Sequence, residues 1–401
     1  MATRRRIFAH STANGLVVFN EQYSHQVCRA SRSRARLFSY KTEPDATLNR
    51  RRATSPEAVR SLSATVARSS SWRGTVYGGW FVNRCTSFAI FAFGAFCATS
   101  TVATAADQTI YAAPDKGVVF VGGVGYTWLK GNELVYDEMG NRISKLIWET
   151  DAPVLTTGLK AEVWNNWTIS ANAVFGFSGN SHMEDYDWIA PYAPSLAEGD
   201  WSHQSIHPDT ELDRYINLDI AAGRDFLIND ATTINLHGGF KYSNVKWSAF
   251  GGSFTYSENG FRDTVINFAD GEHVISYEQR YPGLFLGAEA TSKFDNWTLS
   301  GLLRGGFTVD ASDVDHHWLR SLRFEDDFDI VPFISVGARA DYQMTERASL
   351  FLAGNFDKYF REKGDTTLDD IATGAQVAAF EDSVGMDFYA VTLSAGFKLT
   401  F

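Results

Sequence analysis

The sequence contains little cysteine, and all of it lies near one end of the chain. Only three of the 401 residues are cysteines, Cys28, Cys85 and Cys97, so none lies from Ala106 onward. That part can form no disulfide and offers no thiol nucleophile. It also has no run of about 18 apolar residues, the length that a transmembrane helix needs. If this part of the chain spans a membrane, it must do so with strands.

Two common catalytic signatures are missing as well. No Gly-x-Ser-x-Gly motif is present, which counts against a serine hydrolase. No His-Glu-x-x-His motif or comparable ligand set is present either, so we expect no zinc and no other metal. We also expect no cofactor.

Charge divides the chain into two parts. Residues 1–105 hold 15 Lys+Arg and 4 Asp+Glu, whereas the remainder holds 21 basic and 43 acidic residues. Such a split indicates two joined parts and not one domain of average charge. The acidic part favours cationic partners and argues against nucleic acid.

The basic part itself has two sections. Residues 1–80 are rich in Arg, Ser and Ala without an apolar period, and we expect a disordered extension or a start codon placed too far upstream. Residues 81–105 have the layout of a secretory signal peptide: Arg84, the apolar run Phe88–Cys97 and the small-x-small site Ala103-Thr-Ala105. The apolar run is too short to cross a bilayer as a helix, which argues against a membrane anchor.

From residue 106 onward, apolar residues recur with a period of two. At the C-terminus, alternate positions from Tyr389 to Phe401 are mostly apolar, and the positions between them are small or polar. This is the pattern of an outer-membrane strand, which faces lipid on one side and the lumen on the other. The terminal phenylalanine supports this interpretation. Similar segments occupy 117–138, 141–163, 167–189, 211–228, 232–257, 273–295, 297–315, 321–344, 347–366 and 384–401.

These segments predict an all-β fold, a ten-stranded antiparallel transmembrane β-barrel formed by residues 106–401. Several segments exceed the roughly 9–11 residues that cross a bilayer, so the strands should extend beyond the extracellular side of the outer membrane. Short connections such as 164–166 suit the periplasmic end, and the long connections 190–210 and 258–272 suit the extracellular end. The third and seventh strands would then stand roughly opposite each other across the lumen.

The extracellular ends of these two strands carry acidic residues. Asp313, Asp315 and His317 share one strand face because side chains alternate, and His316 lies on the other. An aspartate beside a histidine can orient its imidazole as a general base. Asp185 and Asp187 share a face of the third strand. The pattern favours a site that activates water, although solvated charges at a barrel rim would look similar.

The order of several motifs resembles the omptin family, outer-membrane endopeptidases of Gram-negative bacteria. The resemblance extends from about residue 117 to the C-terminus and rests on Asp185-Tyr-Asp-Trp188, His207-Pro-Asp-Thr210, Gly251-Gly-Ser-Phe-Thr-Tyr256, Glu258-Asn-Gly-Phe-Arg-Asp263, Tyr277-Glu-Gln-Arg280, Ser312-Asp-Val-Asp-His-His317 and Lys363-Gly-Asp-Thr-Thr-Leu368.

The resemblance implies roles for particular residues. Asp315 and His317 match the family's catalytic Asp–His dyad, and Asp185 and Asp187 match its Asp–Asp couple. A water molecule would attack the peptide carbonyl without a covalent intermediate. The acidic pocket for the residue before the scissile bond is matched by Glu133 and Asp313.

Substrates would thus be cationic peptides or proteins with Arg or Lys before the cut, including dibasic sites. The loop before His207 departs from the family, because His203 and Gln204 stand where further acids are common. Preference after the scissile bond therefore stays open.

A second departure concerns lipopolysaccharide, which the family binds on its outer wall as an activator. Of the matching positions only Arg280 is retained, with Phe240, Tyr242 and Asn244 on the fifth strand and Lys246 nearby. We expect a weak lipopolysaccharide site and a monomer in the outer membrane, with the active site facing outward. The alternative is a catalytically silent outer-membrane barrel that serves as an adhesin or pore.

Overall fold

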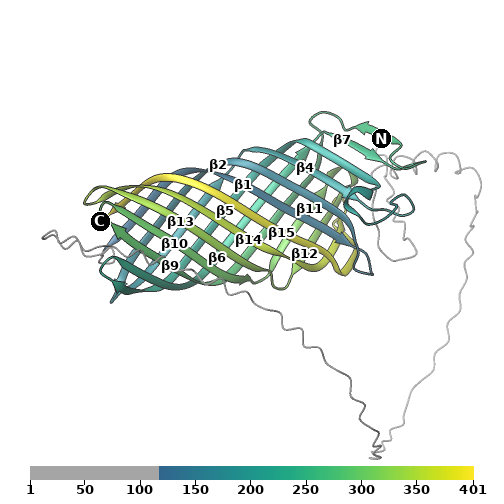
Figure 1. The fold of residues 1–401 in the computed structure, drawn as a ribbon. Coiled ribbons are helices and arrows are strands. Elements are labelled where there is room, and N and C mark those ends of the chain that lie inside the picture. Colours follow the sequence, from purple (N-terminus) through teal and green to yellow (C-terminus); the bar gives the residue numbers. More distant parts are fainter. Residues whose placement is uncertain (1–116) are drawn as a thin grey trace, which may run out of the picture. The chain divides into compact units, whose positions relative to one another are not determined.

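The computed structural model describes residues 117–401, which form one antiparallel sheet of fifteen strands (Figure 1). The sheet closes on itself because β1 (Val118–Tyr136) pairs with β15 (Ala375–Thr400) from Val119↔Thr400 to Val135↔Val384. The expected all-β antiparallel barrel is thereby confirmed. The extension predicted for residues 1–80 and the signal peptide predicted for 81–105 lie outside the described residues.

Like β1, six other strands pair along most of their length with one neighbour on each side. They are β2 (Arg142–Trp164), β5 (His203–Asn229), β6 (Thr232–Phe250), β9 (His273–Phe294), β14 (Ala348–Asp370) and, across the closure, β15. Three other positions in the ring hold two shorter strands each: β3 (Trp167–Gly176) with β4 (Asn180–Asp187), β10 (Trp297–Thr308) with β11 (Ala311–His317), and β13 (Pro332–Thr345) with β12 (Leu322–Phe328). Both members of each pair contact the same neighbouring positions, so each pair occupies one position in the ring. The long strands and these pairs together are consistent with the ten strands expected.

The two ends of the barrel differ in their connections. At one end of the barrel, which is drawn on the left in Figure 1 and which we call the lower end, two-residue turns join β2 to β3, β5 to β6, β9 to β10 and β13 to β14. Asn165, Asn166 and Asp295 adopt positive φ in these turns, a conformation that Asn and Asp tolerate better than most residues. The C-terminus lies at this end (Figure 1). The upper end holds the longer connections and two short 3-10 helices, η1 (Glu198–Asp200) and η2 (Trp318–Arg320).

A small hairpin of β7 (Ser253–Tyr256) and β8 (Thr264–Asn267) projects at the upper end (Figure 1). The sequence predicted an unbroken strand over 232–257, but the strand ends at Phe250. Gly251 and Gly252 follow with φ of 51° and 95°. A Cβ at Gly252 would collide with the carbonyl oxygen of Ile206, so the sharp exit from β6 requires glycine there.

The outer face of the lower half is a belt of exposed apolar side chains. Val124 is 64% exposed, Leu286 76% and Leu352 63%, and Trp167 and Trp297 are exposed close to the lower turns. Inward neighbours such as Thr392 and Ser394 are buried and polar. This alternation is the one predicted for a strand between lipid and lumen. The membrane-spanning part is therefore the lower half, and the strands continue beyond it at the upper end.

Two further predicted strand limits are wrong. The fourth strand begins at His203 and not at 211, so His207-Pro-Asp-Thr210 lies on a strand and not in a loop. The last strand begins at Ala375 and not at 384. Above the belt neither strand face meets lipid. Strand pairing continues there without the apolar alternation from which the strands were predicted.

Stacked aromatic side chains fill the barrel above its membrane-spanning half. Trp148, Trp247 and Tyr277 stack on one another with ring centroids 5.8–6.4 Å apart. Below them Tyr281 stacks on Tyr359 at 4.2 Å, and further rings from Tyr215, Phe333 and Phe388 complete the group. We call these eight rings the aromatic layer. It separates the interior of the barrel into an upper site and a lower lumen.

Candidate active site

Strand β11 supplies one wall of the upper site. Its inward side chains are Asp313, Asp315 and His317, and His317 Nε2 lies 2.7 Å from Asp315 Oδ2. Asp315 is 1% exposed. His316 is on the other face, where its ring stacks on Trp318 at 4.8 Å. Strand parity alone predicted this arrangement of the two histidines.

The neighbours of β11 fix the position of the imidazole. β11 pairs with β9 on one side and β12 on the other, which sets Asp315 opposite both Tyr277 and Phe324. The Phe324 ring meets the His317 ring edge to face at 5.3 Å. The carboxylate and this ring together hold the imidazole in one orientation.

Strand β4 supplies the other wall, with Asp185 and Asp187 half-buried on it. The Ser144 hydroxyl of β2 donates to Asp185 Oδ1 at 3.5 Å. Loss of hydration raises the pKa of Asp187 to about 6, although Ser144, Arg320 and His317 act in the opposite direction. Since His317 of β11 affects a carboxyl of β4, the two walls belong to one electrostatic unit.

Four carboxyl groups are buried at the base of the site, and we call them the acidic cluster: Asp313 and Asp315 of the β11 wall, Glu133 of β1 and Asp326 of β12. Each is at most 4% exposed, and each has at least one buried oxygen without a hydrogen-bond partner. Burial raises the pKa of Glu133 well above its usual range, and the charges of Asp315, Asp313, Asp326 and Asp185 add to this.

Tyr277 anchors the cluster to the aromatic layer. Its hydroxyl donates to Asp313 Oδ2 at 2.7 Å and accepts from Gln279 Nε2 at 2.9 Å. Glu133, in strand β1, lies close enough to Asp313 for the two charges to interact.

Asp326 was missed by the sequence analysis. It belongs to the acidic run Glu325-Asp-Asp327, which resembles a solvated loop. On β12, however, it pairs directly with Asp313, and Asp326 is buried while Asp327 is exposed. Strand alternation within that run could have indicated one inward carboxylate, but not the partner that it meets.

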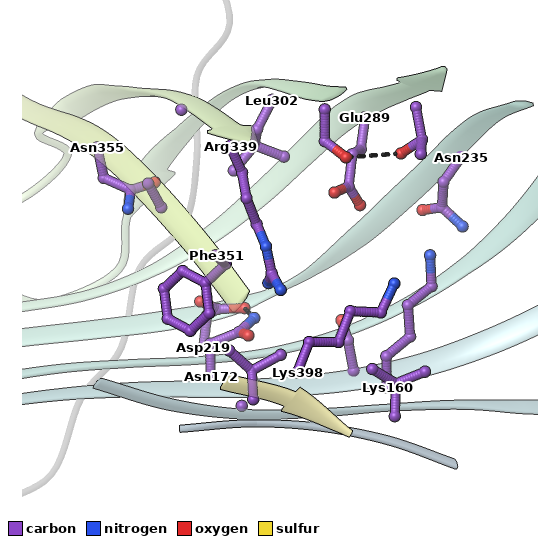
Figure 2. Close-up of a pocket in the computed structure, with 18 of the residues that line it drawn as sticks. Lys160, Asn172, Asp219, Asn235, Glu289, Leu302, Arg339, Phe351, Asn355 and Lys398 are labelled. Carbon is purple, nitrogen blue, oxygen red and sulfur yellow. Dashed lines mark hydrogen bonds between the residues drawn. The ribbon is translucent and has the colours of Figure 1, made fainter. Parts of the chain in front are cut away.

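The lumen below the aromatic layer contains a polar cavity of about 350 Å³ (Figure 2). Figure 2 shows Lys160, Asp219, Glu289, Arg339 and Lys398 among the side chains that line it. Several charged side chains of the lining form ion pairs: Lys241 with Asp357 at 2.5 Å and Arg304 with Asp219 at 3.2 Å. Opposite charges thus neutralise each other in the lumen, unlike in the acidic cluster.

Arg280 lies on the outward face of β9, just above the apolar belt. Its Nη2 contacts Glu278 Oε2 at 2.8 Å, and Arg214 of β5 contacts the same carboxylate at 2.5 Å. The Asn244 amide also donates to Glu278, at 2.8 Å. Both arginines keep about 40% of their side chains exposed.

Within residues 117–401, no three His, Cys, Asp or Glu side chains are grouped so that they could hold a metal ion. Within the same residues no helix is long and apolar enough to cross a membrane.

The closed barrel, its apolar belt and its upper acidic site define the class as an outer-membrane β-barrel protein. The model of the Omptin family matches residues 116–401, more than half of the chain. The chain therefore belongs to the omptin family.

Similar proteins carry protease names. Protease 7 of Escherichia coli O157:H7 is 28% identical over 285 residues, covering 68% of this chain and 86% of the relative. Outer membrane protease OmpP of Escherichia coli strain K12 is 29% identical over 279 residues, with the same two coverages of 68% and 86%. The crystal structure of outer membrane protease OmpT from Escherichia coli superposes with a TM-score of 0.66 at 24% identity, covering 73% of this chain and all of that one, 100%. This last likeness supports the fold.

Proposed function

We propose that the protein is an endopeptidase that cleaves after Arg or Lys, with its site open to the extracellular side. The observation that carries the proposal is the Asp315–His317 contact of 2.7 Å, set opposite Asp185 and Asp187 and above a cluster of buried carboxyl groups. Relatives named as proteases, one of them as an outer membrane protease, support the proposal.

In the proposed reaction a water molecule attacks the peptide carbonyl directly. His317 takes a proton from that water as the new C–O bond forms, and Asp315 orients the imidazole and stabilises its protonated form. Asp185 and Asp187 hold the water from the other wall. The tetrahedral intermediate then collapses, the C–N bond breaks, and His317 returns the proton to the leaving amine.

Specificity would come from the acidic cluster. Buried carboxylates without a positive partner are costly, and a guanidinium or ammonium group of the substrate supplies both the charge and the missing hydrogen-bond donors. Glu133 and Asp313 are the two members that the family resemblance assigns to this task. Neutral side chains would leave the carboxyl groups unsatisfied.

A silent barrel that acts as a pore is less well supported. The aromatic layer fills the interior above the lumen, and ion pairs such as Lys241–Asp357 and Arg304–Asp219 span the lumen from strand to strand. An adhesin without activity would need neither the buried carboxyl groups nor the Asp–His contact.

Lipopolysaccharide binding would use the outward Arg280, with Arg214 beside it. Glu278 neutralises part of their charge, so we propose a weak site for an anionic headgroup at the edge of the membrane. We propose a monomer, because the described barrel closes on itself and leaves no unpaired edge in its ring.

The test is cleavage of a quenched Arg-Arg peptide by the refolded barrel, compared with a peptide that has norleucine in place of the arginine before the cut. In Asp313→Asn the preference for arginine should fall by roughly ten- to hundredfold, because one of the carboxylates that pair with the guest is lost. Asp313 takes no part in the 2.7 Å contact between His317 and Asp315, so kcat should change less than KM. An equal loss for both peptides would assign Asp313 to the chemical step, and no cleavage by the wild-type barrel would reject the proposal.

A further inference from the structure

Asp326 is the member of the acidic cluster to which the family resemblance assigns no role. It is 1% exposed, and neither of its carboxyl oxygens has a hydrogen-bond partner. A packing role would be served better by an apolar residue, because an unsatisfied buried carboxyl group destabilises a fold. Its position therefore points to a partner that arrives from outside.

The group closest to Asp326 across the ladder is another carboxyl group. Antiparallel pairing of β11 and β12 sets Asp326 directly opposite Asp313, which is also 1% exposed. Asp313 already accepts from Tyr277 through Oδ2, and its carboxyl group can form a hydrogen bond with that of Asp326 only when one of the two is protonated. Thr366 of β14 approaches Asp326 without reaching hydrogen-bond geometry.

The other groups that act on this pair are mostly acidic. Asp315 lies on β11 beside Asp313, Asp327 follows on β12, and Glu133 of β1 also interacts with both members. Arg280 of β9 interacts electrostatically with Asp313, but its guanidinium is hydrogen-bonded to Glu278 on the outward face. Within residues 117–401, no basic side chain forms an ion pair with Asp326.

Two carboxyl groups in such surroundings cannot both be ionised without a cation. Burial and the charge of its partner raise the pKa of Asp313 well above its usual range, and burial raises that of Asp326 to about 7. Close carboxyl groups titrate as a pair, so one of the two stays protonated at neutral pH.

We propose that Asp326 is a specificity-determining residue, a third carboxyl group of the site for the basic side chain, and that the Asp313–Asp326 pair holds one proton which it releases when a guanidinium or ammonium group binds. The inference rests on the proposed function, since it assigns the pair to the residue before the scissile bond. The released proton goes to solvent, and the incoming cation takes its place between the two carboxylates. Because the cluster is nearly closed to solvent, neighbouring side chains must move apart to admit the guest.

The consequence is a proton-linked affinity for basic guests. Below the titration of the pair, the guest must displace a proton, so affinity rises as pH increases, by up to about tenfold per pH unit. Above the titration the pair is ready for the cation, and affinity levels off. A neutral guest gains nothing from ionisation, so its binding should not improve over the same pH range.

The first experiment uses the wild-type barrel in detergent and butylguanidinium as the probe. Calorimetric titrations at pH 6.5 in phosphate and in Tris, buffers with different ionisation enthalpies, measure the protons released. We expect release approaching about one proton per probe bound. Butylguanidinium binding with no proton release would overturn the inference, and this measurement needs no variant that could fail to fold.

The second experiment compares KM and kcat for the Arg-Arg peptide between pH 5.5 and 8.5. In the wild type KM should fall with pH through the titration of the pair. In Asp326→Asn the lone Asp313 loses its acidic neighbour, so this dependence should move to lower pH, and KM above pH 8 should rise about tenfold while kcat changes little. Asp327→Asn is the matched control. It removes the same charge from the exposed face of the same strand, where solvent screens its effect on Asp326, so it should shift the KM–pH profile much less than Asp326→Asn does.

The outcomes separate the two proposals. Cleavage after arginine with the same KM–pH profile in Asp326→Asn and wild type would overturn the inference and keep the proposed function. Proton release on binding of butylguanidinium without cleavage of any peptide would overturn the proposed function and keep the carboxyl pair. Neither proton release nor cleavage would overturn both.

Discussion

The upper site and the lumen are built from the same kinds of side chain but treat charge in opposite ways. In the lumen, Lys241 lies 2.5 Å from Asp357, and Arg339 lies 2.5 Å from Asp341 (Figure 2 shows Arg339 among the lining residues). In the acidic cluster, Asp313 and Asp326 face each other with no cation between them. A region that neutralises its own charges is stable by itself, whereas a region that does not is prepared for a ligand.

The largest effect should come from the base of the upper site. Replacing His317 with Ala should lower kcat about 100- to 10,000-fold, because His317 is the proposed general base. His316→Ala is the control, since its ring stacks on Trp318 on the other face and activity should stay within a fewfold of wild type. Initial rates with the quenched Arg-Arg peptide measure both. A reversed order of effects would mean that the inward histidine has been assigned wrongly.

A change in the lumen should affect stability and spare activity. Lys241→Met leaves Asp357 buried without its cation, which should cost about 3 kcal/mol of unfolding free energy. The double variant Lys241→Met with Asp357→Asn removes both charges and should recover much of this loss. Urea unfolding of the barrel in detergent, followed by tryptophan fluorescence, gives the free energies. If the single variant lowered kcat as strongly as His317→Ala, the lumen and the upper site would not be independent regions.

The upper site should show the reverse: replacing one of its carboxyl groups should raise the stability of the barrel and abolish cleavage. The folded pKa of Asp187 is raised to about 6 from an ordinary value of 3.8. The folded protein therefore binds this proton more tightly than the unfolded chain does, so stability falls as pH rises from about 4 to 6 and stays low above 6. Asp187→Asn should raise stability by on the order of 2 kcal/mol at pH 8 and by little near pH 4, while cleavage is lost. Equal stability changes at the two pH values would contradict the raised pKa.

Salt should produce the smallest difference between the regions. Raising ionic strength from about 0.05 to 0.5 M screens the acidic upper site, so KM for the Arg-Arg peptide should increase about two- to fivefold. The buried ion pairs of the lumen are shielded from salt, and the unfolding free energy should hardly change. The peptide with norleucine is the control, because its KM carries less charge attraction. A KM that is independent of salt would exclude long-range attraction of cationic substrates.

The local sequence pattern was sufficient to predict much of the fold and the direction of the site side chains. The alternation at the C-terminus, the short turns such as Asn165-Asn166 and the missing long apolar runs predict the barrel and its orientation of faces, because side-chain direction in a strand depends only on parity. The same parity placed Asp313, Asp315 and His317 on one face and His316 on the other. It also located Asp185 and Asp187 at the end of the strand that faces them.

What parity could not give is the identity of neighbours across strands. The pairing of Asp313 with Asp326 depends on the register between β11 and β12, which is set by a short connection through η2 and by Ser321 at a positive φ of 57°. Likewise, the sequence predicted that two strands begin later than they do, because polar strand segments above the membrane carry no apolar signal. Register and burial arise from contacts between distant parts of the chain, so only the folded barrel decides that one aspartate of Glu325-Asp-Asp327 is solvated and its neighbour is buried against another acid.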